Sequence, residues 1–141
     1  MNLANKVVNK MITGDAFSKW LGIKIIQINE GNCTLEMKIR DEMTNGFKIA
    51  HGGITYSLAD SALAFAANSY GLQSMSIETS ISHTKKVRSG DTLRAFTKEV
   101  NKSKKTAIYY ITITNQDNIE VAHFKGTVYR TDREWFQNKK I

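Results

Sequence analysis

Residues 44–71 read TNGFKIAHGGITYSLADSALAFAANSYG, and the rest of the chain is organised around this stretch. It begins with the turn-prone Thr44-Asn45-Gly46 and continues with a glycine pair after His51. A run from Ile54 to Asn68 follows, and it is apolar on almost every side. A helix that is apolar all round belongs inside a protein, so we predict a buried central helix over residues 54–68.

The segments on both sides of this helix alternate between apolar and polar residues, a pattern typical of strands. Two strands precede the helix as a hairpin, within residues 23–28 and 33–39, and Cys33 lies on the apolar side as a small buried residue. Four strands follow the helix, within residues 74–83, 93–100, 107–114 and 119–130. In the first of these four, one face carries Met75, Ile77, Thr79 and Ile81.

The two ends of the chain have shorter patterns that predict helices. Residues 3–12 have apolar side chains at helical spacing, and Asp15 can cap a second short helical turn that ends near Leu21. We expect this segment, residues 1–21, to cover a sheet edge or an open end. The tail, residues 131–141, holds Trp135 and Phe136, which we expect to pack back as a short helix.

Long antiparallel strands around one apolar helix indicate an α+β fold. We predict a six-stranded, curved antiparallel sheet wrapped around the central helix, with a short N-terminal helix, in a single domain over residues 1–141.

The net charge of +7 is compatible with nucleic acid, with a phosphorylated small molecule or with an ordinary charged surface. The lysines are spread along the chain, and neither zinc-finger spacing nor an RNA-binding motif is present, so we expect no nucleic-acid partner. No run approaches the roughly 20 apolar residues of a membrane span, and no signal peptide is visible, so we expect a cytoplasmic protein without membrane contact. The one cysteine cannot form an internal disulfide.

The sequence lacks the motifs of several common catalytic sites. The sequence has no G-x-S-x-G, no Walker loop and no G-x-G-x-x-G. The histidines His51, His83 and His123 stand alone, without a second ligand two to four residues away, so we expect no metal site.

The glycine pair Gly52-Gly53 at the predicted helix start points to a binding role. Backbone N–H groups at a helix N-terminus lack partners, the helix dipole is positive there, and glycine lets another molecule approach closely. Such a position suits an oxyanion or a phosphate. The alternative is a glycine turn that only starts a helix.

Asp60 is the one carboxylate inside the apolar helix. It follows Gly52 by eight residues, which is about 12 Å along a helix, too far for one carbonyl group to contact both residues of the same chain. Either the two residues do not cooperate, or they come from two chains whose helices run in opposite directions. The second case predicts a homodimer with two equivalent sites at its interface. A third interpretation is a structural carboxylate that accepts hydrogen bonds from nearby backbone or from Ser57.

A wider set of motifs resembles the hotdog-fold acyl-coenzyme A (CoA) thioesterases of the phenylacetic-acid-degradation type. The resemblance covers roughly residues 20–130 and rests on Thr44-Asn45-Gly46, His51-Gly52-Gly53, Leu58-Ala59-Asp60, Ala67-Asn68-Ser69, Ser89-Gly90-Asp91-Thr92-Leu93 and Gly126-Thr127-Val128-Tyr129-Arg130. It implies the hotdog fold, a sheet around one long helix, in dimers that often pair into tetramers. It also implies hydrolysis of acyl-CoA thioesters, with no cofactor besides the CoA of the substrate.

The resemblance also implies roles for individual residues. Gly52 would donate its N–H to the thioester carbonyl, and Asp60 of the other subunit would act as nucleophile or as general base. Asn45 would help hold the nucleophile or substrate, His51 would support the loop or position the thioester, and Ser76 would orient the attacking water.

The chain departs from the family in the segment before Ser89. Many relatives have an aromatic residue and then Arg-Pro there, where this chain has His83 and then Lys85-Lys86. Lysine keeps the charge but lacks the bidentate fork of arginine.

Substrate contacts are expected from several further residues. The CoA phosphates could meet Lys85, Lys86 and Arg88, or the basic turn with Lys102, Lys104 and Lys105. Gly53 and Tyr56 are further candidates, and Tyr56, Phe65, Tyr70 and Met75 are candidates to line an acyl pocket.

The predicted function is hydrolysis of an acyl-CoA to a carboxylic acid and free CoA. Two alternatives stay open: an enoyl-CoA hydratase on the same fold, and a non-catalytic protein that binds acyl-CoA as a sensor.

Overall fold

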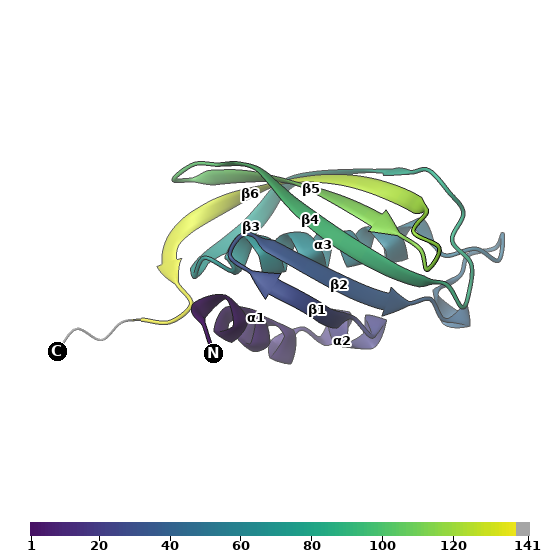
Figure 1. The fold of residues 1–141 in the computed structure, drawn as a ribbon, viewed down its shortest axis with the longest axis horizontal. Coiled ribbons are helices and arrows are strands. Elements are labelled where there is room, and N and C mark those ends of the chain that lie inside the picture. The colour runs from purple at the N-terminus through teal and green to yellow at the C-terminus, as the bar shows by residue number, and fades with distance from the viewer. Residues whose placement is uncertain (138–141) are drawn as a thin grey trace.

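A curved antiparallel sheet wraps around one long helix, α3 (Gly52–Asn68), in the computed structural model, which describes residues 1–137 (Figure 1). The sheet has six strands in the order β1-β2-β4-β5-β6-β3. Their bounds are β1 (Lys24–Asn29), β2 (Asn32–Lys38), β3 (Leu72–His83), β4 (Thr92–Lys102), β5 (Thr106–Thr114) and β6 (Glu120–Glu134). The predicted α+β hotdog architecture is therefore confirmed.

The central helix contacts five of the strands, β2 to β6, and supplies much of the core. Its side chains at Leu58, Leu63 and Phe65 are almost fully buried, and the alanines between them let the sheet approach closely. The helix begins at Gly52, two residues before the predicted start. The helix is apolar because it is buried on most sides, as the sequence predicted.

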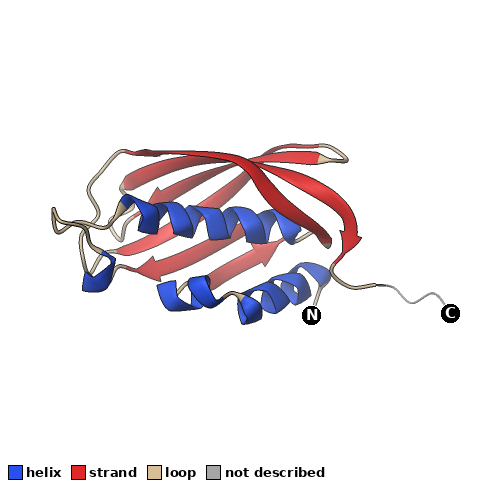
Figure 2. Ribbon diagram, turned by 180° about the vertical axis from the view of Figure 1, so that it is seen from behind, coloured by secondary structure: helices blue, strands red, loops and turns tan. Residues whose placement is uncertain are grey.

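Two short helices, α1 (Leu3–Gly14) and α2 (Ala16–Leu21), flank α3 on the same side of the sheet, near β1 (Figure 2). Asp15 caps α2 by accepting a hydrogen bond from the Ser18 N–H at 3.0 Å, as predicted. Because α1 contacts both β1 and α3, this segment covers the open end of the core beside β1.

Strand β3 corrects one prediction from the sequence. Met75 and Ile77 are 65% and 63% exposed, although the alternation placed them on a face shared with Ile81. A β-bulge between Ser76 and Glu78 shifts the register against β6, and a bulge exchanges the two faces of a strand. Before the bulge the even-numbered residues therefore face α3, and after it the odd-numbered residues do.

The tail corrects a second prediction. Residues 131–134 do not form a helix but continue β6, because the start of β3 offers them a pairing partner from Leu72 onward. Trp135 does pack back: its backbone N–H donates to the Gly71 carbonyl at 2.9 Å and its indole N–H donates to Oδ1 of Asn68 at 2.8 Å. The last part of the predicted helical tail, residues 138–141, lies outside the described residues.

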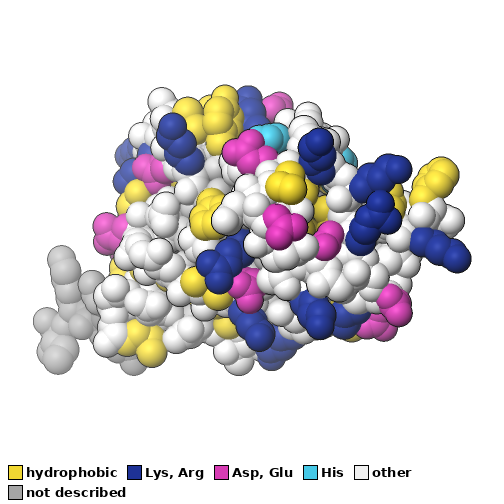
Figure 3. Space-filling model, turned by 45° about the vertical axis from the view of Figure 1, so that its right-hand side comes forward, with side chains coloured by type: hydrophobic (Ala, Val, Ile, Leu, Met, Phe, Trp, Pro, Cys, Tyr) yellow, Lys and Arg dark blue, Asp and Glu magenta, His cyan; other side chains and the backbone are white. Residues whose placement is uncertain are grey.

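Basic and acidic side chains are mixed over the face shown in Figure 3, without a continuous basic stripe. Among the described residues, none of the helices has the length and apolar character needed to cross a membrane.

Candidate active site

At the N-terminus of α3, the backbone N–H of Gly52 is left without an acceptor among residues 1–137. His51 is the N-cap residue, and its Nδ1 accepts a hydrogen bond from the Gly53 N–H at 3.0 Å, while its carbonyl accepts from the Ile54 N–H at 2.9 Å. Within residues 1–137, the Gly52 N–H has no hydrogen-bond acceptor. To contact a substrate, the Gly53 N–H would have to give up its hydrogen bond to His51. The Gly52 N–H is available and lies at the positive end of the helix dipole.

The loop before α3 is shaped by Asn45. Its side-chain Oδ1 accepts a hydrogen bond from the Phe47 N–H at 2.9 Å, and its backbone N–H donates to the Ile49 carbonyl at 2.8 Å. These bonds form an Asx turn and leave the side-chain amide nitrogen of Asn45 as the group that could reach a ligand. Ala50 then donates to the Val87 carbonyl at 2.7 Å, which joins the loop to the basic segment that contains Lys85, Lys86 and Arg88.

Gly52 lies directly beside the imidazole of His83, at the end of β3. A Cβ atom added to Gly52 would stand 3.3 Å from Nε2 of His83. In the sequence, His83 stood out only because many of the proteins that the chain resembles have an aromatic residue at this position. The structure adds it to the groups around the N-terminus of α3.

A hollow of about 380 Å³ opens at this helix end, and we call it the Gly53 pocket. It is lined by Phe17, Glu42, Met43, Thr44, His51, Gly53, Ile54 and Ser57. Phe17 comes from α2, is 54% exposed and stacks on Trp20 with ring centroids 6.1 Å apart. The sequence did not predict this residue for the site, because only tertiary packing brings α2 to the start of α3.

A second hollow, of about 240 Å³, surrounds the carboxylate farther along α3, and we call it the Asp60 pocket. It is lined by Asp60, Leu63, Ala64, Ser74, Met75, Ser76 and Val128. Ser76 reaches this pocket because it precedes the β3 bulge and pairs with the buried Val128, so that it faces the helix. The structure thus brings together Asp60 and Ser76, two of the residues singled out from the sequence.

The carboxyl group of Asp60 is half-buried and, in the part of the chain that the structure describes, has no hydrogen-bond partner. The alternative partner, Ser57, instead donates to the Gly53 carbonyl at 2.6 Å. Burial raises the pKa of Asp60 above its ordinary value, and the negative charge of Asp15 raises it further. A carboxylate with a raised pKa and no partner is a better proton acceptor than an ordinary aspartate.

The two pockets have no lining residue in common. Gly52 does not line the Gly53 pocket but directly precedes Gly53, and it is separated from Asp60 by about 12 Å along α3. One chain therefore holds two separate parts of a candidate site.

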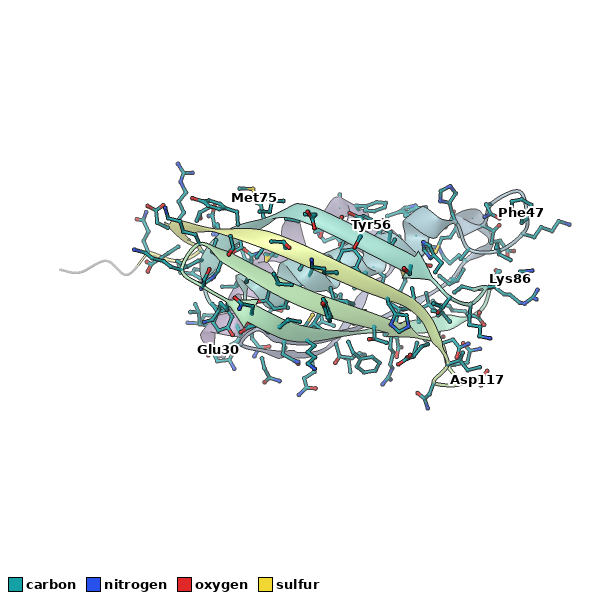
Figure 4. All side chains as sticks on the ribbon, turned by 90° about the horizontal axis from the view of Figure 1, so that it is seen from above. Glu30, Phe47, Tyr56, Met75, Lys86 and Asp117 are labelled. Atoms are coloured by element: carbon teal, nitrogen blue, oxygen red, sulfur yellow. The ribbon has the colours of Figure 1, made fainter. Side chains whose placement is uncertain are left out.

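Other candidate residues lie in several places. The Tyr56 hydroxyl bonds the Thr79 hydroxyl at 2.6 Å, between α3 and β3. Phe65 is buried in the core, and Tyr70 lies beyond the C-terminus of α3, where it donates to Glu99. Figure 4 places Met75 toward one end of the molecule and Phe47 and Lys86 toward the other, with Tyr56 between them.

Cys33 is fully buried, and burial raises its pKa to about 12, as fits a small core residue rather than a nucleophile. Over residues 1–137, no group of three or more His, Cys, Asp and Glu side chains could hold a metal ion.

Comparison with known proteins gives consistent matches. The model of the thioesterase superfamily matches residues 47–122. A putative esterase of Archaeoglobus fulgidus is 38% identical over 133 residues, covering 94% of this chain and 86% of that protein. The acyl-coenzyme A thioesterase PaaI of Escherichia coli is 39% identical over 120 residues, covering 85% and 86%.

Solved structures agree. The structure of E. coli PaaI, from the phenylacetic acid degradation operon, has a TM-score of 0.91 at 37% identity and covers 93% of this chain and 95% of that one. The smu.793 protein of Streptococcus mutans, solved with bound acetyl CoA, has a TM-score of 0.77 at 26% identity, with coverage of 79% and 90%.

Proposed function

This chain belongs to the thioesterase superfamily and is an acyl-CoA thioesterase, and from that premise we propose that it hydrolyses its substrate in two sites shared between the subunits of a homodimer. Each site combines the Gly52 N–H of one subunit with the Asp60 carboxylate of the other. The observation that carries this proposal is that one α3 holds the two groups apart: the Gly52 N–H has no acceptor within residues 1–137, and Asp60 lies farther along the helix in a pocket of its own.

The Gly52 N–H polarises the thioester carbonyl and holds the oxyanion that forms on it. Within residues 1–137 this N–H has no acceptor, and the dipole of a 17-residue helix lies behind it. A preorganised donor of this kind is worth about 10²–10³ in kcat.

Asp60 supplies the base or the nucleophile. As a base it takes a proton from water while the water oxygen bonds to the thioester carbon, and Ser76 orients that water. As a nucleophile it forms a mixed anhydride that water then cleaves. In both routes the C–S bond breaks, the electron pair leaves with the CoA sulfur, and the sulfur takes up a proton.

The free edge of β3 supports the dimer. Strand β3 ends the sheet, and Met75 and Ile77 are both exposed near it. An unpaired edge with exposed apolar residues is a template for pairing with another chain. Antiparallel pairing of two β3 strands sets the two α3 helices in opposite directions, which is the arrangement that a shared site requires.

We propose that two such dimers pair further into a tetramer. Phe96 and Tyr110, on β4 and β5, are 40% and 50% exposed. Two such sheet faces would cover each other in a dimer of dimers.

The other candidate residues support the site formed by Gly52 and Asp60. His51 fixes the start of α3, and Asn45 shapes the loop and offers its amide nitrogen to the substrate. Tyr56 ties α3 to β3 below the site. Lys85, Lys86 and Arg88 are exposed, and their charges attract the phosphate-bearing substrate toward Gly52.

The Gly52 N–H can be removed with little change to the helix. Gly52 is the first residue of α3, where proline is well tolerated, and His51 has φ −59° and ψ 137°, which suits a residue before proline. We expect Gly52→Pro to lower kcat by about 10²–10³. Gly52→Ala is the matched control, because it adds a Cβ at the same place but keeps the N–H. Equal activity of the two variants would contradict the role of the N–H.

Mixed dimers test the shared site. A Gly52→Pro chain and an Asp60→Ala chain are each expected to be inactive alone. After unfolding and refolding together, each mixed dimer contains one site with an intact Gly52 and an intact Asp60, so activity returns. If both residues had to come from the same chain, mixing would restore nothing. A thiol-release assay over a panel of acyl-CoAs gives the rate, and binding without thiol release would favour the sensor alternative.

A further inference from the structure

The imidazole of His83 lies beside the backbone N–H that the proposed site uses. A Cβ atom added to Gly52 would stand 3.3 Å from Nε2, 3.7 Å from Cε1 and 4.0 Å from Cδ2 of His83, so the ring turns its Nε2 edge toward Gly52. His83 is the last residue of β3 and is exposed. Within residues 1–137 its imidazole has no hydrogen-bond partner. Two polar groups without partners thus lie next to each other in one subunit.

One oxygen atom can accept hydrogen bonds from both groups. The backbone N and the Cβ of a residue are about 2.5 Å apart, so the N of Gly52 and the Nε2 of His83 are at most about 5.8 Å apart, the sum of that distance and 3.3 Å. The heavy atoms of an N–H···O bond are about 2.7–3.2 Å apart, so one oxygen can bridge two donors separated by up to about 6.4 Å. The carbonyl oxygen that the Gly52 N–H polarises is therefore within reach of His83.

The symmetry of the proposed dimer gives an independent argument for the same place. When Gly52 of one subunit faces Asp60 of the other, the two-fold axis passes near Tyr56, which lies halfway between them on α3. The Tyr56 hydroxyl bonds the Thr79 hydroxyl at 2.6 Å. The axis therefore also passes near Thr79 on β3.

This axis brings His83 to the Asp60 pocket of the other subunit. On β3, His83 lies four residues after Thr79, and Met75 lies four residues before it. In an antiparallel pair centred near Thr79, His83 of one strand is level with Met75 of the other. Because Met75 lines the Asp60 pocket, the imidazole and the Gly52 N–H of one subunit meet the Asp60 carboxylate of the other.

We propose that His83 is a further catalytic residue, whose Nε2–H donates a second hydrogen bond to the thioester oxygen that the Gly52 N–H binds. The inference rests on the proposed function and adds to it a side chain from the end of β3. When water or Asp60 attacks, the thioester carbon becomes tetrahedral and its oxygen gains negative charge, so both hydrogen bonds strengthen. The imidazole keeps its proton throughout.

The inference is specific to this chain. An aromatic hydrocarbon ring, which many of the proteins that the chain resembles have at this position, fills the same space but has no N–H to donate. His83→Phe is therefore the variant that removes the donor and keeps a ring. His83→Gln is its counterpart, because the glutamine amide carries N–H groups at the end of a side chain of similar length.

Thiol release from an acyl-CoA measures the effect. We expect His83→Phe to lower kcat by about 10² and to leave KM within about threefold, because the lost hydrogen bond is stronger in the transition state than in the bound substrate. We expect His83→Gln to keep kcat within about tenfold of the parent. Parent-like turnover in His83→Phe, or an equal loss in both variants, would overturn the donor role.

His123→Phe is the control variant. His123 lies on β6, and it lines a hollow with Tyr110 and Thr112 on the face of the sheet turned away from α3. The substitution makes the same chemical change outside the proposed site, and we expect it to leave kcat unchanged. A loss as large as that of His83→Phe would show that the effect does not come from the site, and it would overturn the inference.

Binding separates this inference from the proposed function. The probes are the ketone analogue of acetyl-CoA, in which CH₂ replaces the ester sulfur, and S-ethyl-CoA, which has no carbonyl group. By calorimetry, we expect His83→Phe to bind the ketone about fivefold to tenfold more weakly than the parent, and to bind S-ethyl-CoA equally, as a folded variant must. This result would support His83 even if the parent hydrolyses no thioester, an outcome that would reject the proposed function alone. Equal binding of the ketone by parent and variant would overturn the assignment of His83.

Discussion

The hydroxyl oxygen of Ser18 on α2 lies 2.8 Å from the hydroxyl oxygen of Ser61 on α3, one residue after Asp60. Ser18 also donates to Oδ2 of Asp15 at 2.6 Å, so Ser61 is the donor to Ser18. This chain of hydrogen bonds holds the N-terminus of α2, with the carboxylate of Asp15, against the helical turn that carries Asp60. The negative charge of Asp15 is accordingly one cause of the raised pKa of Asp60.

The first prediction concerns the pH dependence of hydrolysis. Asp60 acts in its deprotonated form, so the rate falls as pH decreases through its raised pKa. Asp15→Asn removes the neighbouring charge while asparagine still caps α2, so we expect the acidic limb of the kcat profile to move to lower pH. A less basic Asp60 is also a weaker proton acceptor, and we expect the plateau rate to fall by less than about tenfold.

The control for this prediction is Ser18→Ala, which breaks the link between α2 and α3 but keeps the Asp15 charge. Its acidic limb should stay closer to that of the parent than the limb of Asp15→Asn does. An unmoved limb in Asp15→Asn would show that Asp15 does not act on Asp60.

The second prediction concerns stability. The folded-state pKa of Asp60 lies above its ordinary value of 3.8, so its contribution to stability is present below that value and is lost as pH rises through the folded pKa. Asp60→Asn removes this cost at neutral pH and breaks no hydrogen bond among the described residues. We expect the variant to lose hydrolysis, to remain dimeric and to melt at a higher temperature than the parent at pH 7, with the difference closing toward pH 3.

Thermal melts of parent and variant over this pH range make the measurement. Asp117→Asn, in the exposed turn between β5 and β6, removes the same charge from the surface and serves as the control (Figure 4). Near-normal turnover in Asp60→Asn would reject the catalytic role, and a lower melting temperature at pH 7 would reject the stability argument.

The third prediction concerns the contact between α3 and β6. A Cβ atom added to Gly126 would lie 2.5 Å from Cδ2 of Leu63 and 3.1 Å from Cε1 of Phe124, both in the core. We expect Gly126→Ala to lower the free energy of unfolding by about 1–3 kcal/mol, because an overpacked core must shift its side chains. Denaturant unfolding measures this change. Gly14→Ala is the control, since nothing lies within 4 Å of its added Cβ, and an equal effect of both substitutions would contradict the contact.

Much of the fold followed from local patterns. The apolar run of α3 and the alternation in the flanking segments predicted the helix and all six strands, because burial on all sides or on one side leaves a direct trace in residue order. The predictions that failed concern segments whose structure depends on how β3 pairs with β6. The bulge in β3 turned Met75 outward, and the long β3 recruited residues 131–134 into β6 instead of a helix.

For the candidate site, the sequence by itself determined the chemical groups: a glycine pair at a helix start, a carboxylate eight residues later, and a spacing along the helix that keeps them apart. Only the tertiary structure decided what surrounds them. The bulge aims Ser76 at Asp60, α2 brings Asp15 and Phe17 to α3, and the end of β3 sets His83 beside Gly52. These neighbours are distant in sequence, and the contacts that join them arise when the sheet closes around the helix, so no local pattern of residues encodes them.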